Sequence, residues 1–158
     1  MTCTEQKAAP DDKRPDPPVG QRKAAEAEED LMVPSSKIFF EEVRAAYAAM
    51  AGALHLAGPV EAENVLPVST YTGGGVDYSV ELDVREGYVD CVVGTETETV
   101  DFTVNVEQLA LTAGVIECHG KISYSARNLA QLRPRLRSAA NQAGQASVLS
   151  WSARRVRP

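Results

Sequence analysis

The sequence predicts an α+β domain: an N-terminal helix, an antiparallel meander of four to five strands, and a C-terminal helix packed on the same sheet face as the first. Apolar residues recur at helical spacing in two separate segments, and between these segments they alternate with polar residues at strand spacing. The chain has 158 residues, of which 44% are hydrophobic. That length has room for one domain of ordinary size, with a core that needs no disulfides.

The first helix is predicted from about residue 37 to about residue 57. Ser35 or Ser36 can cap its N-terminus, and Gly58-Pro59 is expected to end it. Steps of three or four residues connect the members of one apolar stripe, which are Phe39, Val43, Tyr47, Met50 and Leu54.

The predicted meander begins with a strand over residues 64–72. Gly73-Gly74-Gly75 follows it and leads into another strand, which indicates a hairpin connection. A phosphate-binding loop would instead lead into a helix N-terminus.

The next predicted strands cover residues 76–85, 88–94 and 100–106, with a turn at Glu86-Gly87. Strands joined by sequential hairpins form a sheet with one buried and one solvated face. The buried face is expected to carry Tyr78, Val80, Leu82 and Cys91.

A two-residue turn at Glu86-Gly87 would place Asp83 directly opposite Asp90 on the solvated face. Like charges that face each other across two strands are destabilising unless a cation lies nearby. The candidate partner-binding residues are therefore the acidic side chains of this face, Asp77, Glu81, Asp83 and Asp90. The plainer interpretation is a solvated surface with no partner.

After the sheet, residues 107–113 are expected to form a helical turn and residues 115–119 a short strand. A second amphipathic helix is predicted from Ser125, kinked or started by Pro134 and ended by Gly144. Its apolar stripe consists of Leu129, Leu132, Leu136, Ala140 and Ala143. Residues 147–152 are expected to form a last strand or a docked tail.

Charge is divided unevenly along the chain, whose net charge is −6. Residues 1–33 form a predicted disordered tail, acidic and rich in proline. Within the predicted domain, residues 34–153, the part up to residue 125 carries four basic and fourteen acidic side chains. Residues 126–158 carry seven arginines and no acid, and they end in a basic tail at 154–158.

The three cysteines are isolated, which predicts a reducing compartment without a disulfide framework. The N-terminal residues lack an apolar stretch typical of a secretory signal, and no run is long enough for a membrane span. These observations predict a cytoplasmic protein.

The sequence makes no case for an enzyme, a cofactor or a metal. Histidine occurs only at His55 and His119. In the predicted strand, Cys118 and His119 would point to opposite faces and could not act on one atom. A metal site formed by Cys91, Cys118 and His119 would need a fourth ligand.

The leading hypothesis is a non-enzymatic protein-interaction domain that binds a basic partner, such as a toxin, through the acidic sheet face. The helix–meander–helix plan and the acidic surface, over residues 34–146, resemble small bacterial immunity and adaptor proteins. A homodimer that covers the second sheet face is left open.

Two alternatives remain. A nucleic-acid-associated regulatory protein would use Arg133, Arg135, Arg154 and Arg155 against phosphates. A small-molecule-binding domain would have an apolar pocket near Tyr47, Tyr78 and Phe102, although core packing explains these three residues equally well.

Overall fold

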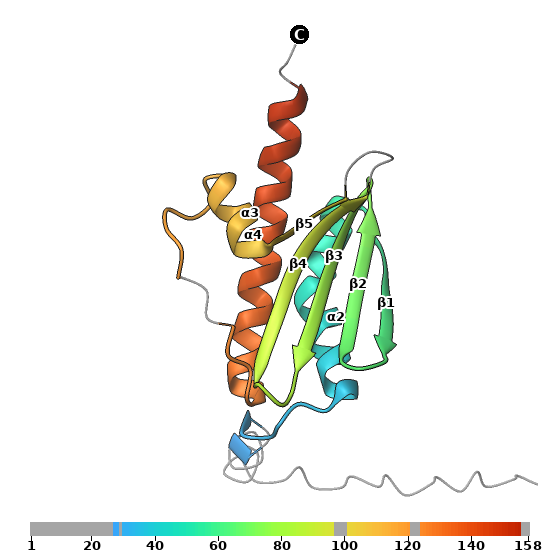
Figure 1. Ribbon diagram of the computed structural model, residues 1–158, viewed down its shortest axis with the longest axis vertical. Helices are drawn as coiled ribbons and strands as arrows, with labels where there is room; N and C mark the ends of the chain where they lie inside the picture. Colours follow the sequence, from blue (N-terminus) through green and yellow to red (C-terminus); the bar gives the residue numbers. More distant parts are fainter. Residues whose placement is uncertain (1–26, 29, 97–100, 121–123, 156–158) are drawn as a thin grey trace, which may run out of the picture.

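The computed structural model describes residues 27–28, 30–96, 101–120 and 124–155. A five-stranded antiparallel sheet in sequential order, β1-β2-β3-β4-β5, lies against two long helices (Figure 1). The elements in chain order are α2 (Ser36–Leu54), β1 (Ala57–Glu63), β2 (Pro67–Gly73), β3 (Val76–Asp83), β4 (Tyr88–Glu96), β5 (Asp101–Asn105), α3 (Val106–Thr112) and α4 (Leu129–Arg155). The predicted α+β fold, with helices before and after a meander, is confirmed.

Helix α2 begins and ends through local hydrogen bonds. The side chain of Ser35 accepts a hydrogen bond from the N–H of Ile38, as an N-cap does. The helix ends at Leu54, because His55 adopts the left-handed conformation with φ of 54°. The prediction that Gly58-Pro59 ends the helix is therefore wrong, and these two residues lie inside β1. All five residues of the predicted stripe are buried.

The hairpins explain the order of the strands. Gly74 and Gly75 both have positive φ and form the two-residue turn between β2 and β3, where Gly73 pairs with Val76. The prediction of a hairpin at these glycines is confirmed. Strand β1 was not among the predicted strands, and the strand expected over residues 64–72 starts only at Pro67.

The register of β3 and β4 differs from the prediction. Asp83 pairs with Tyr88, Leu82 with Val89 and Glu81 with Asp90, so the connection is a four-residue loop over residues 84–87. The carboxylate of Asp83 accepts hydrogen bonds from the backbone N–H groups of Arg85 and Glu86 (2.9 and 3.0 Å). These two bonds stabilise the loop. The predicted pairing of Asp83 with Asp90 is wrong.

Helix α4 is longer than predicted. The side chain of Asn128 accepts a hydrogen bond from the N–H of Gln131 (3.0 Å), and Pro134 lies inside the helix. The helix continues through Gly144 to Arg155, so residues 147–152 are helical and form neither a strand nor a docked tail. Its five predicted stripe residues are buried.

Between β5 and α4 the chain forms α3, close to the predicted helical turn at 107–113. Residues 115–119 form bends and a turn, so the short strand predicted there is wrong. The chain then returns to the sheet beside the start of β4, where Ser125 forms an isolated bridge with Tyr88.

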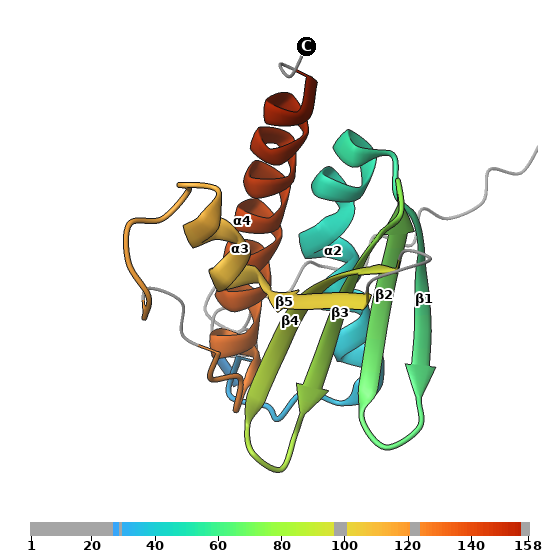
Figure 2. The ribbon, with the colours of Figure 1, turned by 45° about the horizontal axis from the view of Figure 1, so that its top comes forward.

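The core lies between the helices and one face of the sheet, the inner face. Helices α2 and α4 run side by side in the same direction across this face (Figures 1 and 2). The sheet contributes buried residues from alternate positions, among them Tyr71, Tyr78, Val80, Leu82, Val89 and Cys91. Both helices thus pack on the predicted face. Phe102 is an exception to the predicted core, because 54% of its surface is exposed.

Most of the predicted N-terminal tail, residues 1–26 and 29, lies outside the described residues. The part that follows contacts α4: the carbonyl of Met32 accepts a hydrogen bond from the N–H of Leu129 (3.2 Å). Pro34, directly after it, is buried.

Candidate partner-binding surface

The acidic residues singled out from the sequence lie on the outer face of the sheet, opposite the helices. Successive residues of a strand point to opposite faces, and the residues that alternate with the buried ones on β3 are Asp77, Ser79, Glu81 and Asp83. Asp90 lies between the buried residues Val89 and Cys91 of β4. The structure therefore brings all four predicted residues to one face. None of the described helices covers this face (Figures 1 and 2).

Glu81 and Asp90 form the centre of this surface. They are direct cross-strand partners, so their Cβ atoms lie about 5 Å apart. Asp77 is opposite Gly94, and Asp83 is opposite Tyr88 with its carboxylate engaged in the turn. In the described part of the chain, neither Glu81 nor Asp90 has an ion-pair partner.

The strands themselves carry a single sign of charge. None of the five strands contains a lysine or an arginine. The two acidic residues of β1 that do have partners point to the helix side: Glu61 forms an ion pair with Arg44 (3.2 Å), and Glu63 accepts a hydrogen bond from Ser36. The outer face of the strands therefore has carboxylates and no internal cation.

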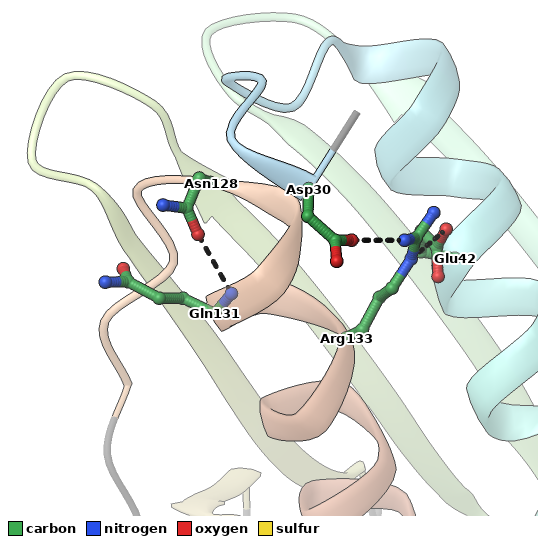
Figure 3. Close-up of polar contacts among 5 residues, drawn as sticks. All are labelled: Asp30, Glu42, Asn128, Gln131 and Arg133. Carbon is green, nitrogen blue, oxygen red and sulfur yellow. Dashed lines mark hydrogen bonds and ion pairs between the residues drawn. The ribbon is translucent and has the colours of Figure 1, made fainter. Parts of the chain in front are cut away.

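The arginines of α4 separate into two groups. Near the start of α4, Arg133 bridges two acidic residues, with Nη1 2.8 Å from Asp30 and Nε 2.9 Å from Glu42 (Figure 3). Arg135 is partly buried, and its Nε makes no hydrogen bond within the described residues. Arg154 and Arg155 lie at the other end of α4, about 30 Å away at 1.5 Å per residue.

The cysteines and histidines are not brought together. Cys91 is fully buried, and burial raises the pKa of its thiol to about 12, although a hydrogen bond with Tyr47 acts in the opposite direction. Cys118 and His119 are exposed in the bends and turn before α4. Among the residues that the structure describes, no three histidine, cysteine or acidic side chains form a group suited to a metal ion.

An outer-face hollow of about 360 Å³ was not predicted from the sequence. Its lining residues come from the β1–β2 hairpin and from β3: Ala62, Asn64, Val65, Leu66, Val68 and Glu81. The sequence analysis could not predict this hollow, because it did not identify β1 as a strand. Ala62 pairs with Val68, and Val68 pairs with Glu81, so the hollow borders directly on the acidic centre.

A second hollow, of about 440 Å³, lies between the C-terminal part of α2 and α4. Its lining is almost entirely apolar: Met50, Ala53, Leu54, Val115, Gly144, Gln145, Val148 and Leu149. The predicted small-molecule pocket was placed elsewhere, near Tyr47, Tyr78 and Phe102. Tyr47 and Tyr78 are packed in the core, where Tyr47 stacks on Tyr71 with ring centroids 5.7 Å apart.

Comparison of the chain with models of known protein families, with curated proteins and with solved structures gives no match. Among the described helices, none combines the length and the apolar character that crossing a membrane requires.

Proposed function

We propose that this chain is a non-enzymatic protein-interaction domain that binds a basic protein partner in the cytoplasm through the outer face of β3 and β4. One observation carries the proposal: Glu81 and Asp90 face each other on a sheet surface that none of the described helices covers, and the strands contain no basic residue. A like-charge pair in this position costs stability, and a cationic group from a partner would relieve that cost. Opposite charges across the interface would also speed association and favour the correct partner.

The nucleic-acid alternative has weaker support. Arg133 is engaged with Asp30 and Glu42, and about 30 Å of helix separates it from Arg154 and Arg155. The four arginines therefore do not form one compact phosphate-binding patch.

The proposal is tested with Glu81→Lys/Asp90→Lys, which reverses the charge at the centre of the surface. The matched control is Glu41→Lys/Glu117→Lys, which makes the same change in net charge at two exposed positions outside the sheet. Wild-type protein, variant and control are immobilised and exposed to lysate of the source cell at low ionic strength. Bound proteins are identified by mass spectrometry, and their affinities are then measured with purified material.

We expect a basic protein that the wild type and the control retain equally and that the Glu81→Lys/Asp90→Lys variant loses, with affinity falling as salt rises. A partner that binds this variant as tightly as the wild type would contradict the proposal. Circular dichroism verifies that each variant is folded.

A further inference from the structure

The outer face presents one continuous row of side chains across four strands. The register aligns Ala62 of β1, Val68 of β2, Glu81 of β3 and Asp90 of β4. The first half of this row is apolar and the second half is acidic. The hollow of about 360 Å³ opens over the apolar half, beside Val65, which is 94% exposed.

An apolar surface next to two carboxylates fits an arginine side chain better than it fits a small inorganic cation. Arginine has an aliphatic stem that packs on apolar surface while its charged end reaches a polar group. Its planar guanidinium presents five donors, enough to bond two carboxylates at once. With the stem along Val68, the guanidinium would reach Glu81 and Asp90, which lie on adjacent strands about 4.8 Å apart.

The chain itself carries an arginine-rich segment, residues 154–158, which can supply such a side chain. Helix α4 contains five arginines and no acid, and residues 154–158 combine three arginines with Val156 and Pro158. The C-terminal part of α4 also extends away from α2. α4 packs against α2 at Gly144, where an added Cβ would lie 3.3 Å from Met50, and it then continues to Arg155, well beyond the end of α2 (Figure 1).

The segment cannot reach the hollow within the same molecule. The C-terminal end of α4 and the β1–β2 hairpin lie at opposite ends of the molecule in both views (Figures 1 and 2). Strand β1 alone is about 23 Å long, whereas residues 156–158 of the segment span at most about 11 Å even when fully extended. A contact between the two must therefore join different copies.

We propose that residues 154–158 of a second copy of this chain dock on the row formed by Ala62, Val68, Glu81 and Asp90. An arginine of the segment bonds both carboxylates, and its stem together with Val156 covers the hollow. This proposal rests on the proposed function, because it uses the same acidic centre, and it adds a regulatory consequence: self-association and a basic partner compete for one surface. The contact joins different patches of the two copies, so it is compatible with a reciprocal two-fold dimer as well as with rings and open chains.

The experiment measures the self-association of the full chain by sedimentation velocity over a range of concentrations at low and high ionic strength. The face variant is Glu81→Lys/Asp90→Lys, and the segment variant is Arg154→Glu/Arg155→Glu/Arg157→Glu. The control is again Glu41→Lys/Glu117→Lys. We expect the wild type and the control to form larger species with rising concentration at low ionic strength only. The two test variants stay monomeric, because each then carries like charges on both contact surfaces.

Mixing the two test variants in equal amounts provides the decisive measurement. In the mixture each basic surface meets an acidic one, so association is expected to return to at least a large fraction of the wild-type level. A wild type that stays monomeric at low ionic strength, or a mixture that does not associate, would overturn the proposal. If a variant proves unfolded, Glu81→Gln/Asp90→Asn and Arg154→Gln/Arg155→Gln/Arg157→Gln replace the reversals, and the loss of association is the readout.

The same variants separate this proposal from the proposed function. If the wild type does not self-associate but the face variant still loses a basic partner, only the second-copy proposal fails. If the face variant retains that partner, the proposed function itself fails.

Discussion

Strands β3 and β4 present two faces of opposite character, although both faces are built from the same two stretches of backbone. On the inner face, Tyr78, Leu82 and Cys91 are buried beneath the helices. On the outer face, Glu81 and Asp90 oppose each other, and neither has an ion-pair partner among the described residues. Because successive side chains alternate, a single register sets both faces at once.

The two faces contribute differently to the free energy of unfolding. The inner face gains free energy from apolar burial, about 25 cal/mol for each Å² removed from water. The outer face gains less, because its apolar residues Val68 and Val92 are only partly buried, and its central acidic pair reduces stability. Substitutions on the two faces should therefore change the free energy of unfolding in opposite directions, and four predictions test this difference.

The largest effect is expected from Leu82→Ala, which removes a fully buried side chain at the centre of the inner face. The lost burial and the resulting cavity should lower the free energy of unfolding by about 2–5 kcal/mol, measured by urea denaturation. Val84→Ala, two residues further along and 42% exposed, is the control and should cost less than about 1 kcal/mol. Equal losses in the two variants would mean that the inner face does not carry the core.

A second test concerns high pH. Burial raises the pKa of the Cys91 thiol from 9.0 to about 12 in the folded state. Between these values the unfolded chain loses the thiol proton while the folded chain keeps it, so stability should fall as pH rises from about 9 to about 12. In Cys91→Ala this fall should be smaller, though not absent, because burial also raises the pKa of Tyr47.

The measurement for this test is the slope of the urea midpoint against pH, which does not depend on the loss that Cys91→Ala causes at neutral pH. Cys118→Ala, at an exposed thiol, is the control. If Cys91→Ala keeps the wild-type slope, the thiol does not contribute to the alkaline loss.

An intermediate effect is expected at a hydrogen bond that joins the sheet to the late part of α4. The hydroxyls of Tyr78 and Ser147 lie 2.6 Å apart and are buried. Tyr78→Phe leaves the Ser147 hydroxyl without this partner and should cost about 1–2 kcal/mol. Adding Ser147→Ala should cost little more, since both polar groups are then absent. A double variant whose loss equals the sum of the two single losses would contradict this account.

Sequence reasoning succeeded for the two faces because their signal is periodic. The stripe of α2 and the alternation in β3 each recur with a fixed period that only one kind of element satisfies. The pairing of β3 with β4 was harder to predict, because sliding one strand by two residues keeps every side chain on its face. The assumed Glu86-Gly87 turn therefore gave the correct faces and the wrong partners. The hydrogen bonds from Arg85 and Glu86 to the Asp83 carboxylate favour the observed four-residue loop.

Glycine caused two further errors, since its local preferences allow more than one role. Gly58 was assigned to the helix end, but it lies in β1 with φ of 111° and the helix has already ended at His55. Gly144 was assigned as a stop for α4, whereas it lies where α4 approaches Met50 of α2. From the sequence alone, a glycine that allows two helices to pack closely cannot be distinguished from a glycine that ends a helix. The hollow near Val65 was missed because β1 was not predicted: the alternation of Val60 and Ala62 with Glu61 and Glu63 covers only four residues.

The smallest effect should come from the outer face, and it should be a gain. Glu81→Gln keeps the shape of the side chain and removes one of two opposed charges, so the free energy of unfolding should rise by about 0.2–1 kcal/mol at low ionic strength. Glu41→Gln, at an exposed position of α2, makes the same change in net charge and should alter stability less. Adding Asp90→Asn to Glu81→Gln should bring little further gain, because the first substitution has already removed the repulsion. If Glu81→Gln gains no more than Glu41→Gln, the acidic pair costs the fold nothing, and the need for a cationic partner at this surface loses its physical basis.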